Sequence, residues 1–132
     1  SSFVSQALVE EAWHNHSFIF VSHAPPKDTV LDCTSSNVHV GSLAVRRFIA
    51  KWAASGRLVA TLHGHIHESP WMTGRVWQEI HGVPCFNVGQ KTKILRALLF
   101  DTERVRESAR LVLVDKGGAK SIMDRDQWLP EQ

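Results

Sequence analysis

The chain has 132 residues, 43% hydrophobic and 21% charged, a composition that supports a folded core and is far from that of a disordered protein. Fifteen Lys and Arg against thirteen Asp and Glu leave a net charge of +2, too close to neutral to indicate nucleic-acid binding through bulk charge. No apolar run approaches the ~20 residues that a transmembrane helix needs, so we expect no membrane partner.

The chain has two cysteines, Cys33 and Cys85, which are too few for a disulfide framework and lack a metal-ligand spacing. A bridge between Cys33 and Cys85 is left open by the sequence. The simpler expectation is a cytoplasmic protein with two reduced thiols, because disulfides are rare in that compartment.

The first predicted elements are an amphipathic helix and a short strand. Apolar residues recur near helical spacing over residues 2–13. Residues 17–22 read Ser-Phe-Ile-Phe-Val-Ser, an aromatic and β-branched run that predicts a strand ending at His23. Residues 25–40 are rich in Pro, Asp, Ser, Thr and Asn and predict a loop.

Three polar side chains of this loop have two interpretations. Asp28, Asp32 and His39 follow the end of a strand, where they would border a site. Aspartates in loops more often cap turns or face solvent, and this second interpretation is the stronger one.

A helix and a second strand follow the loop. Ser42 is a suitable N-cap for a helix whose apolar face recurs at Val45, Phe48, Ile49 and Trp52 and which ends near Gly56. Residues 57–62 read Arg-Leu-Val-Ala-Thr-Leu and predict a strand. Strand, helix and strand in this order predict a parallel βαβ unit, with both strands ending at one edge of the sheet.

A histidine-rich segment, Leu-His-Gly-His-Ile-His-Glu-Ser, spans residues 62–69 and ends this second strand. On an extended backbone, His65 and His67 would share one face with Cα atoms about 6.6 Å apart. That spacing lets two side chains reach different ions of a metal pair held ~3.5–4 Å apart, and Gly64 would permit a close turn. The alternative is a surface loop in a chain that contains eight histidines.

The remaining sequence predicts antiparallel strands without helices, followed by a tail. The predicted strands cover residues 75–80, 83–88, 94–100 and 110–114. Residues 115–132 mix Gly, Lys, Asp and Pro and predict a poorly ordered tail. The predicted organisation is therefore one unit over 1–114 and a tail over 115–132.

Three motifs together carry a resemblance to a known family. They are Val-Ser-His-Ala-Pro-Pro at 21–26, Gly-His-Ile-His-Glu at 64–68 and Asn-Val-Gly at 87–89. This combination resembles the second half of a calcineurin-like metallophosphoesterase over about residues 17–113. The order and spacing of the first two motifs are fairly specific, whereas either one alone is weak.

The resemblance implies an α/β fold, part of a four-layer β-sandwich with flanking helices. It also implies a centre of two divalent ions, such as Mn, Fe, Zn or Ni, that activates a hydroxide to attack the phosphorus of a phosphoester substrate. His23 and His65 would bind one ion and His67 the other.

The chain also departs from the family pattern. The earlier family motifs, Asp-x-His, Gly-Asp-x-x-Asp and Gly-Asn-His-Asp/Glu, do not occur in this sequence. The chain thus resembles the carboxyl-terminal portion of a metal-dependent phosphoester hydrolase, with no catalytic residue assigned, at most one metal ion bound and no activity alone. An amino-terminal half or a homodimer would cover its open sheet edge. A phosphoesterase-like scaffold for a protein partner and a histidine-based metal-binding module are the alternatives.

Overall fold

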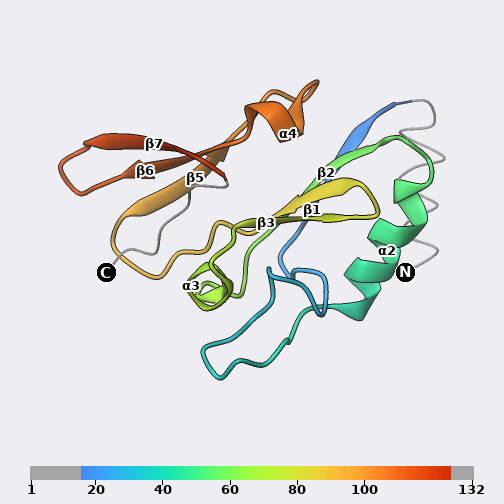
Figure 1. Ribbon diagram of the computed structural model, residues 1–132, viewed down its shortest axis with the longest axis horizontal. Helices are drawn as coiled ribbons and strands as arrows, with labels where there is room; N and C mark the ends of the chain where they lie inside the picture. The colour runs from blue at the N-terminus through green and yellow to red at the C-terminus, as the bar shows by residue number, and fades with distance from the viewer. Residues whose placement is uncertain (1–15, 126–132) are drawn as a thin grey trace.

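The computed structural model describes residues 16–125, which form two β-sheets and three short helices (Figure 1). The helix predicted over residues 2–13 lies outside this range. The helices are α2 (Leu43–Ala53), α3 (Ser69–Thr73) and α4 (Val105–Ser108). The strands are β1 (Phe18–Ser22), β2 (Leu58–His63), β3 (Trp77–Ile80), β4 (Val83–Phe86), β5 (Leu95–Leu99), β6 (Arg110–Val114) and β7 (Lys120–Asp124).

The larger sheet contains the predicted βαβ unit. Its strand order is β1-β2-β4-β3, and β1 pairs with β2 in parallel. The connecting helix α2 begins where the sequence predicts, because the hydroxyl of Ser42 accepts a hydrogen bond from the N–H of Val45 (3.1 Å). The carboxyl ends of β1 and β2 therefore meet at one edge of the sheet.

The strands after β2 do not form the single antiparallel meander that the sequence predicts. β3 and β4 form a hairpin, but β4 inserts in parallel beside β2, and β5, β6 and β7 form a separate antiparallel sheet. All four residues of β4 are buried, as suits a strand in the middle of a sheet. The expectation of strands without helices is also wrong, since α4 lies between β5 and β6.

The expectation of a poorly ordered tail is wrong for residues 120–124, which form β7. The turn from β6 to β7 closes when the N–H of Gly118 donates to the carbonyl of Asp115 (3.0 Å). Gly118 has a φ of 82°, a conformation that glycine adopts without a Cβ clash. A turn-rich sequence thus forms a hairpin rather than a tail.

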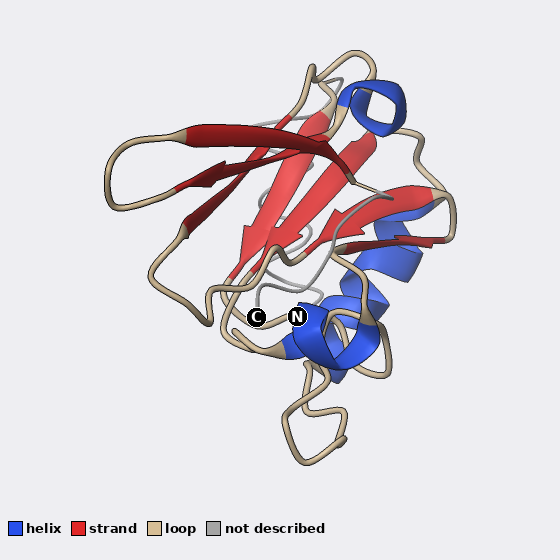
Figure 2. Cartoon of the chain, turned by 60° about the vertical axis from the view of Figure 1, so that its left-hand side comes forward, coloured by secondary structure: helices blue, strands red, loops and turns tan. Residues whose placement is uncertain are grey.

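The elements stack in three layers, with α2 on one face of the larger sheet and the smaller sheet on the other (Figures 1 and 2). One core cluster, which includes Ile49, Trp52 and Leu58, lies between α2 and the larger sheet. A second cluster lies between the sheets, where Phe86 of β4 stacks on Phe100 with ring centroids 6.1 Å apart.

The structure also shows the state of the two cysteines and the lengths of the helices. Cys33 and Cys85 are both buried and free, so the bridge that the sequence left open is not formed. No helix in the described part of the chain is long and apolar enough to cross a bilayer.

Candidate metal centre

The two parallel strands of the βαβ unit bring His23 and His65 together. Ser22 at the end of β1 pairs with His63 at the end of β2, and the chain then leaves the sheet at both places. The N–H of Gly64 donates to the carbonyl of His23 (3.1 Å), which joins the two exits. The imidazole rings of His23 and His65 lie with centroids 4.5 Å apart. Two residues 42 positions apart in sequence (65 − 23) thus form one exposed pair at the sheet edge.

The backbone at His65 is turned, not extended. His65 has a φ of 64°, and the N–H of Ile66 donates across it to the carbonyl of Gly64 (2.7 Å). This hydrogen bond between residues two apart, with a positive φ in the middle, is a γ-turn of the rare, strained kind. Strain at a residue other than glycine is more common at functional sites. The expectation that His65 and His67 share one face of an extended strand is therefore wrong.

The strained position also differs from the one that the sequence suggested. Gly64 has no left-handed φ, and a Cβ built on it would meet no atom within 4 Å. The positive φ falls on His65 instead, so a side chain that could bind a ligand occupies the unusual backbone position.

His67 is exposed, and its backbone is held by a neighbouring loop. Its carbonyl accepts a hydrogen bond from the N–H of Gln90 (3.1 Å). A Cβ on Gly89 would lie 2.6 Å from the same carbonyl oxygen, so only glycine allows this approach. The loop containing His67 is thus packed closely on residues 87–90.

Asn87 is the residue that ties these loops together, and the sequence indicated it only as part of a turn. Its side-chain amide donates to the carbonyls of Leu31 (2.9 Å) and Ile66 (3.0 Å). Its side-chain oxygen accepts a hydrogen bond from the N–H of Gly89 (3.0 Å). The Asn-Val-Gly motif therefore fixes the backbone beside His65 and His67.

His63 supports the strand ends and is not available as a ligand. The Ser22 hydroxyl donates its one proton to the carbonyl of Ala24 (2.7 Å). Nδ1 of His63 lies 2.9 Å from the same hydroxyl oxygen and must therefore be the donor in that hydrogen bond. Nε2 of His63 then accepts a hydrogen bond from the Thr61 hydroxyl (2.7 Å). Burial lowers the pKa of His63 to about 4, although hydrogen bonds with the backbone of Ala24 and Ser22 raise it. The ring is therefore neutral near neutral pH.

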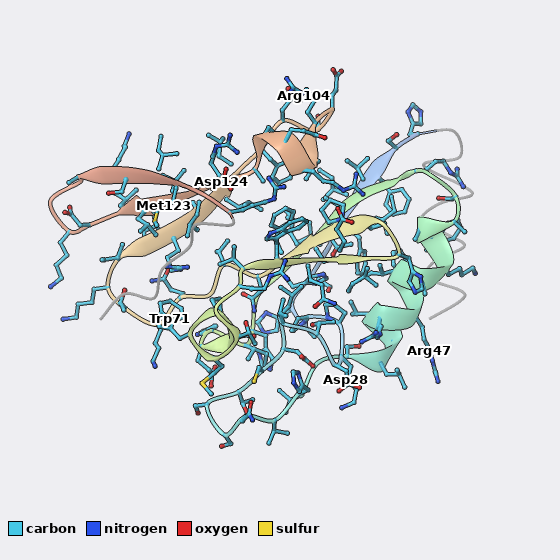
Figure 3. The ribbon with its side chains drawn as sticks, viewed as in Figure 1. Asp28, Arg47, Trp71, Arg104, Met123 and Asp124 are labelled. Atoms are coloured by element: carbon cyan, nitrogen blue, oxygen red, sulfur yellow. The ribbon has the colours of Figure 1, made fainter. Side chains whose placement is uncertain are left out.

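The loop after β1 is organised around Asp32, which is fully buried. Its carboxylate accepts hydrogen bonds from the N–H groups of Asp28 (2.8 Å), Thr29 (3.0 Å) and Gly41 (2.9 Å) and from Nδ1 of His39 (2.6 Å). Burial raises the pKa of Asp32, but the hydrogen bonds from His39 and the backbone lower it more, so it lies below its usual range. Asp32 and His39 therefore stabilise the loop. Asp28, labelled in Figure 3, is exposed in the same loop.

The residues present fit part of a metal site. Two imidazoles side by side suit a transition ion. Within residues 16–125, however, no group of three or more His, Cys, Asp or Glu side chains is placed to hold a metal ion. The three predicted ligands do not form such a group, because only His23 and His65 lie together.

Comparisons of the chain with protein-family models, with curated proteins and with solved structures found no match. The resemblance to calcineurin-like phosphoesterases therefore stays a prediction, based on the three motifs.

Proposed function

We propose that this chain is the carboxyl-terminal portion of a metal-dependent phosphoester hydrolase of the calcineurin-like type. His23 and His65 would bind one divalent ion, and His67 would contribute to a second. When bound, such a pair of ions supplies an activated hydroxide that attacks phosphorus. The remaining ligands would come from a segment or partner outside this sequence.

The observation that carries the proposal is the His23 and His65 pair at the carboxyl ends of β1 and β2. The ring centroids are 4.5 Å apart, and the backbone bond from Gly64 to His23 fixes the two loops relative to each other. Ligands of open α/β sheets bind outside the carboxyl ends of the strands. The position of the pair supports the proposal.

The chain's own residues would have separate tasks in this site. His23 and His65 would donate a ring nitrogen each, which requires neutral imidazoles. The γ-turn at His65 and the Asn87 hydrogen bonds would limit the movement of these rings and reduce the entropy lost on binding. His63 would keep the two strand ends in register.

The proposed fold has one layer more than the described residues form. The outer face of the smaller sheet carries Leu95 and Leu99 of β5 and Ile122 of β7, which are 58%, 61% and 67% exposed. Exposed apolar surface of this kind marks a contact surface. It supports a further layer on this side, as the four-layer β-sandwich would have.

Metal titration calorimetry tests the proposal, with Mn²⁺ or Zn²⁺ as the titrant. Loss of one ligand should lower the affinity by about 10- to 100-fold, at least as much as loss of an outer-shell partner does. We expect this for His23→Ala and for His65→Asn, since Asn tolerates the positive φ at that position. Affinity should also fall in acid, because bound imidazoles must be neutral.

The matched control is His81→Asn, which removes an exposed histidine from another positive-φ position, in the turn between β3 and β4. It should leave the affinity unchanged. Equal binding by the wild type and the His23→Ala/His65→Asn double variant would refute the assignment.

A second candidate is a phosphoesterase-like scaffold that binds a protein partner and performs no chemistry. The lack of a third metal-capable side chain beside His23 and His65 among residues 16–125 favours it. A hydrolysis assay of the full-length protein with an aryl phosphodiester distinguishes the two candidates. Metal-dependent hydrolysis would favour the enzyme, and its absence would favour the scaffold.

A further inference from the structure

The outer face of the smaller sheet carries a continuous apolar surface. Residues directly across from one another on neighbouring strands share one face of a sheet. By the register of β5, β6 and β7, six apolar residues share this face, and we call them the outer patch: Leu95, Ala97, Leu99, Val112, Val114 and Ile122. The residues between them face the larger sheet, since Leu98 and Leu111 belong to buried clusters. Figures 1 and 2 show no described helix on the outer side of this sheet.

Three exposed lysines gather at one end of the outer patch. Lys120 lies directly across from Val114, which lies across from Leu95. Lys93 comes shortly before Leu95, and Lys116 lies in the turn between β6 and β7. None of the three lysines forms an ion pair with a carboxylate of residues 16–125. We call this the lysine end of the patch.

The two carboxylates of the hairpin formed by β6 and β7 already have partners. Asp115 accepts hydrogen bonds from the N–H groups of Gly117 and Ala119 (both 2.9 Å). At the end of the patch away from the lysines, Asp124 and Arg110 lie 3.9 Å apart as an ion pair. The outer patch therefore has a basic end and an end where the charges of β6 and β7 are paired.

The patch has the dimensions of one α-helix. Three strands at a spacing of ~4.8 Å place the outer two about 10 Å apart, which is close to the diameter of a helix. A strand of five residues, such as β5, spans roughly 16 Å, the length of a helix of roughly 11 residues. The larger sheet is covered in this way by α2, which has 11 residues and buries Ile49 and Trp52. One amphipathic helix of about three turns would cover the patch.

A second copy of this chain does not complement the patch. Its α2 reads Leu-Ala-Val-Arg-Arg-Phe-Ile-Ala-Lys-Trp-Ala and contains no carboxylate. Two patches packed face to face would place the lysine end on the other lysine end or on the paired Arg110 and Asp124. The first arrangement brings like charges together, and the second offers the lysines no additional anion. Charge complementarity therefore favours a different partner that carries carboxylates.

We propose that the outer patch binds an acidic amphipathic helix of a partner protein. The apolar side of the helix packs on the patch, and its carboxylates lie at the lysine end. Acidic side chains stabilise the first turn of a helix, so the amino terminus of the bound helix lies at this end. Neither His23 nor His65 takes part, so this surface is independent of metal binding.

Fluorescence anisotropy of labelled peptides tests the proposal with the full chain. The probe is a stapled helical peptide of about 14 residues, with Leu at helical spacing on one side and Glu in its first turn. The reference peptide has Lys in place of Glu. The Glu peptide should bind about tenfold more tightly at low salt, because its carboxylates meet lysines, and added salt should reduce the difference.

Variants of the chain separate the apolar and the charged parts of the surface. Leu99→Thr/Ile122→Thr should weaken binding of the Glu peptide about tenfold or more, because both residues are more than half exposed and would lose apolar contacts. Lys116→Glu/Lys120→Glu should reverse the preference, so that the Lys peptide binds more tightly. Thermal unfolding checks that both variants are folded. Lys116→Glu alone, in the exposed turn, should reduce the preference without touching a strand.

Val21→Thr and Lys51→Glu are the matched controls and should leave the affinity unchanged. Val21 is 69% exposed on β1, and Lys51 is exposed on α2. Failure of the wild type to bind the Glu peptide overturns the proposal, as does equal affinity for the two peptides or binding that the Thr substitutions leave intact. Sedimentation with phosphatidylserine vesicles is measured as well, since lysines beside apolar residues also suit anionic lipid. Vesicle binding without peptide binding would assign the patch to a membrane surface and overturn the proposal.

Discussion

Gly41 and Gly64 are the same residue type at the ends of two segments that border the histidine pair, yet their surroundings are opposite. A Cβ on Gly41 would lie 2.7 Å from the carbonyl oxygens of Pro25 and Pro26 and 2.8 Å from the Asp32 carboxylate. A Cβ on Gly64 would meet nothing within 4 Å. Packing thus requires glycine at position 41, whereas no contact with residues 16–125 requires it at position 64.

Gly41→Ala should therefore destabilise the protein by about 3 kcal/mol, since rigid backbone atoms must move to accept the methyl group. Gly64→Ala should change the free energy of unfolding by less than about 1 kcal/mol. Urea denaturation of the two variants beside the wild type measures both values. Equal losses would mean that the close packing around Gly41 is wrong.

The buried thiol of Cys85 should make the free energy of unfolding fall at alkaline pH. Burial raises the pKa of its thiol from 9.0 to about 11, although hydrogen bonds with the Thr61 side chain and the Ile80 backbone lower it. The unfolded chain therefore releases this proton at a lower pH than the folded chain. The contribution is complete below pH 9 and is lost as pH rises toward 11, by on the order of 3 kcal/mol in all.

The measurement is the free energy of unfolding of the wild type and of Cys85→Ala across this alkaline range. Cys85→Ala leaves a cavity, which costs stability equally at every pH. The wild type should lose stability more steeply with rising pH than the variant. Parallel curves would contradict the burial of a neutral thiol.

At the scale of single residues, the sequence predicted the histidine pair but not the hydrogen bonds that hold the strand ends beside it. His23 and His65 follow strand-like runs, and that pattern is local. The burial of His63 and its bonds to Ser22 and Thr61 depend on two strands pairing in one register, and no local pattern reports that register. For the same reason the sequence placed the turn at Gly64, whereas the positive φ lies at His65.

At the scale of elements, strand β4 and the loop after it hold together segments that are far apart in the sequence. β4 lies beside β2, and Asn87 follows its end and reaches two other segments through the carbonyls of Leu31 and Ile66. The sequence predicted the strands near their observed bounds, because alternating and apolar runs are local signals. It did not predict that β4 enters the sheet in parallel, because partner choice depends on contacts that are distant in sequence.

Asn87→Ala should destabilise the protein by about 2–4 kcal/mol, because two buried carbonyls lose their donor. The control is Gln90→Ala, whose side-chain amide donates to the carbonyls of Thr92 and Ile94 at the exposed surface, where water can replace it. Its side-chain oxygen also accepts one part-buried hydrogen bond, from the N–H of Arg96 (3.2 Å), so that control should cost about 1 kcal/mol. Chemical denaturation gives both values, and an Asn87→Ala variant as stable as the control would show that the loops are held by other contacts.

At the scale of the whole molecule, residues 16–125 form three layers, and Leu95, Leu99 and Ile122 are exposed on the smaller sheet. The side chains between the sheets come from both halves of the sequence, so the sandwich could not be predicted from either half alone. The coarse α/β class and the βαβ unit were predictable, since strand-helix-strand order restricts the topology. The hairpin that adds β7 to the smaller sheet was not predicted, because the turn-rich composition of residues 115–119 is also typical of a disordered tail.

The proposed half-site leads to a prediction about activity. A site that holds two ions needs a bridging carboxylate and further ligands to lower the pKa of the shared water. Within residues 16–125 only His23 and His65 lie together as candidate ligands, and no carboxylate completes a group with them. We therefore expect these 132 residues alone to hydrolyse an activated aryl phosphodiester no faster than buffer with the same Mn²⁺.

The assay needs two controls, because traces of a contaminating phosphatase would imitate activity. His65→Asn removes one proposed ligand, and His81→Asn removes a histidine outside the site from a similar backbone conformation. Turnover that persists in all three proteins comes from a contaminant. Turnover that His65→Asn abolishes and His81→Asn leaves intact would mean that the chain completes its own catalytic site, and the half-site proposal would then be wrong.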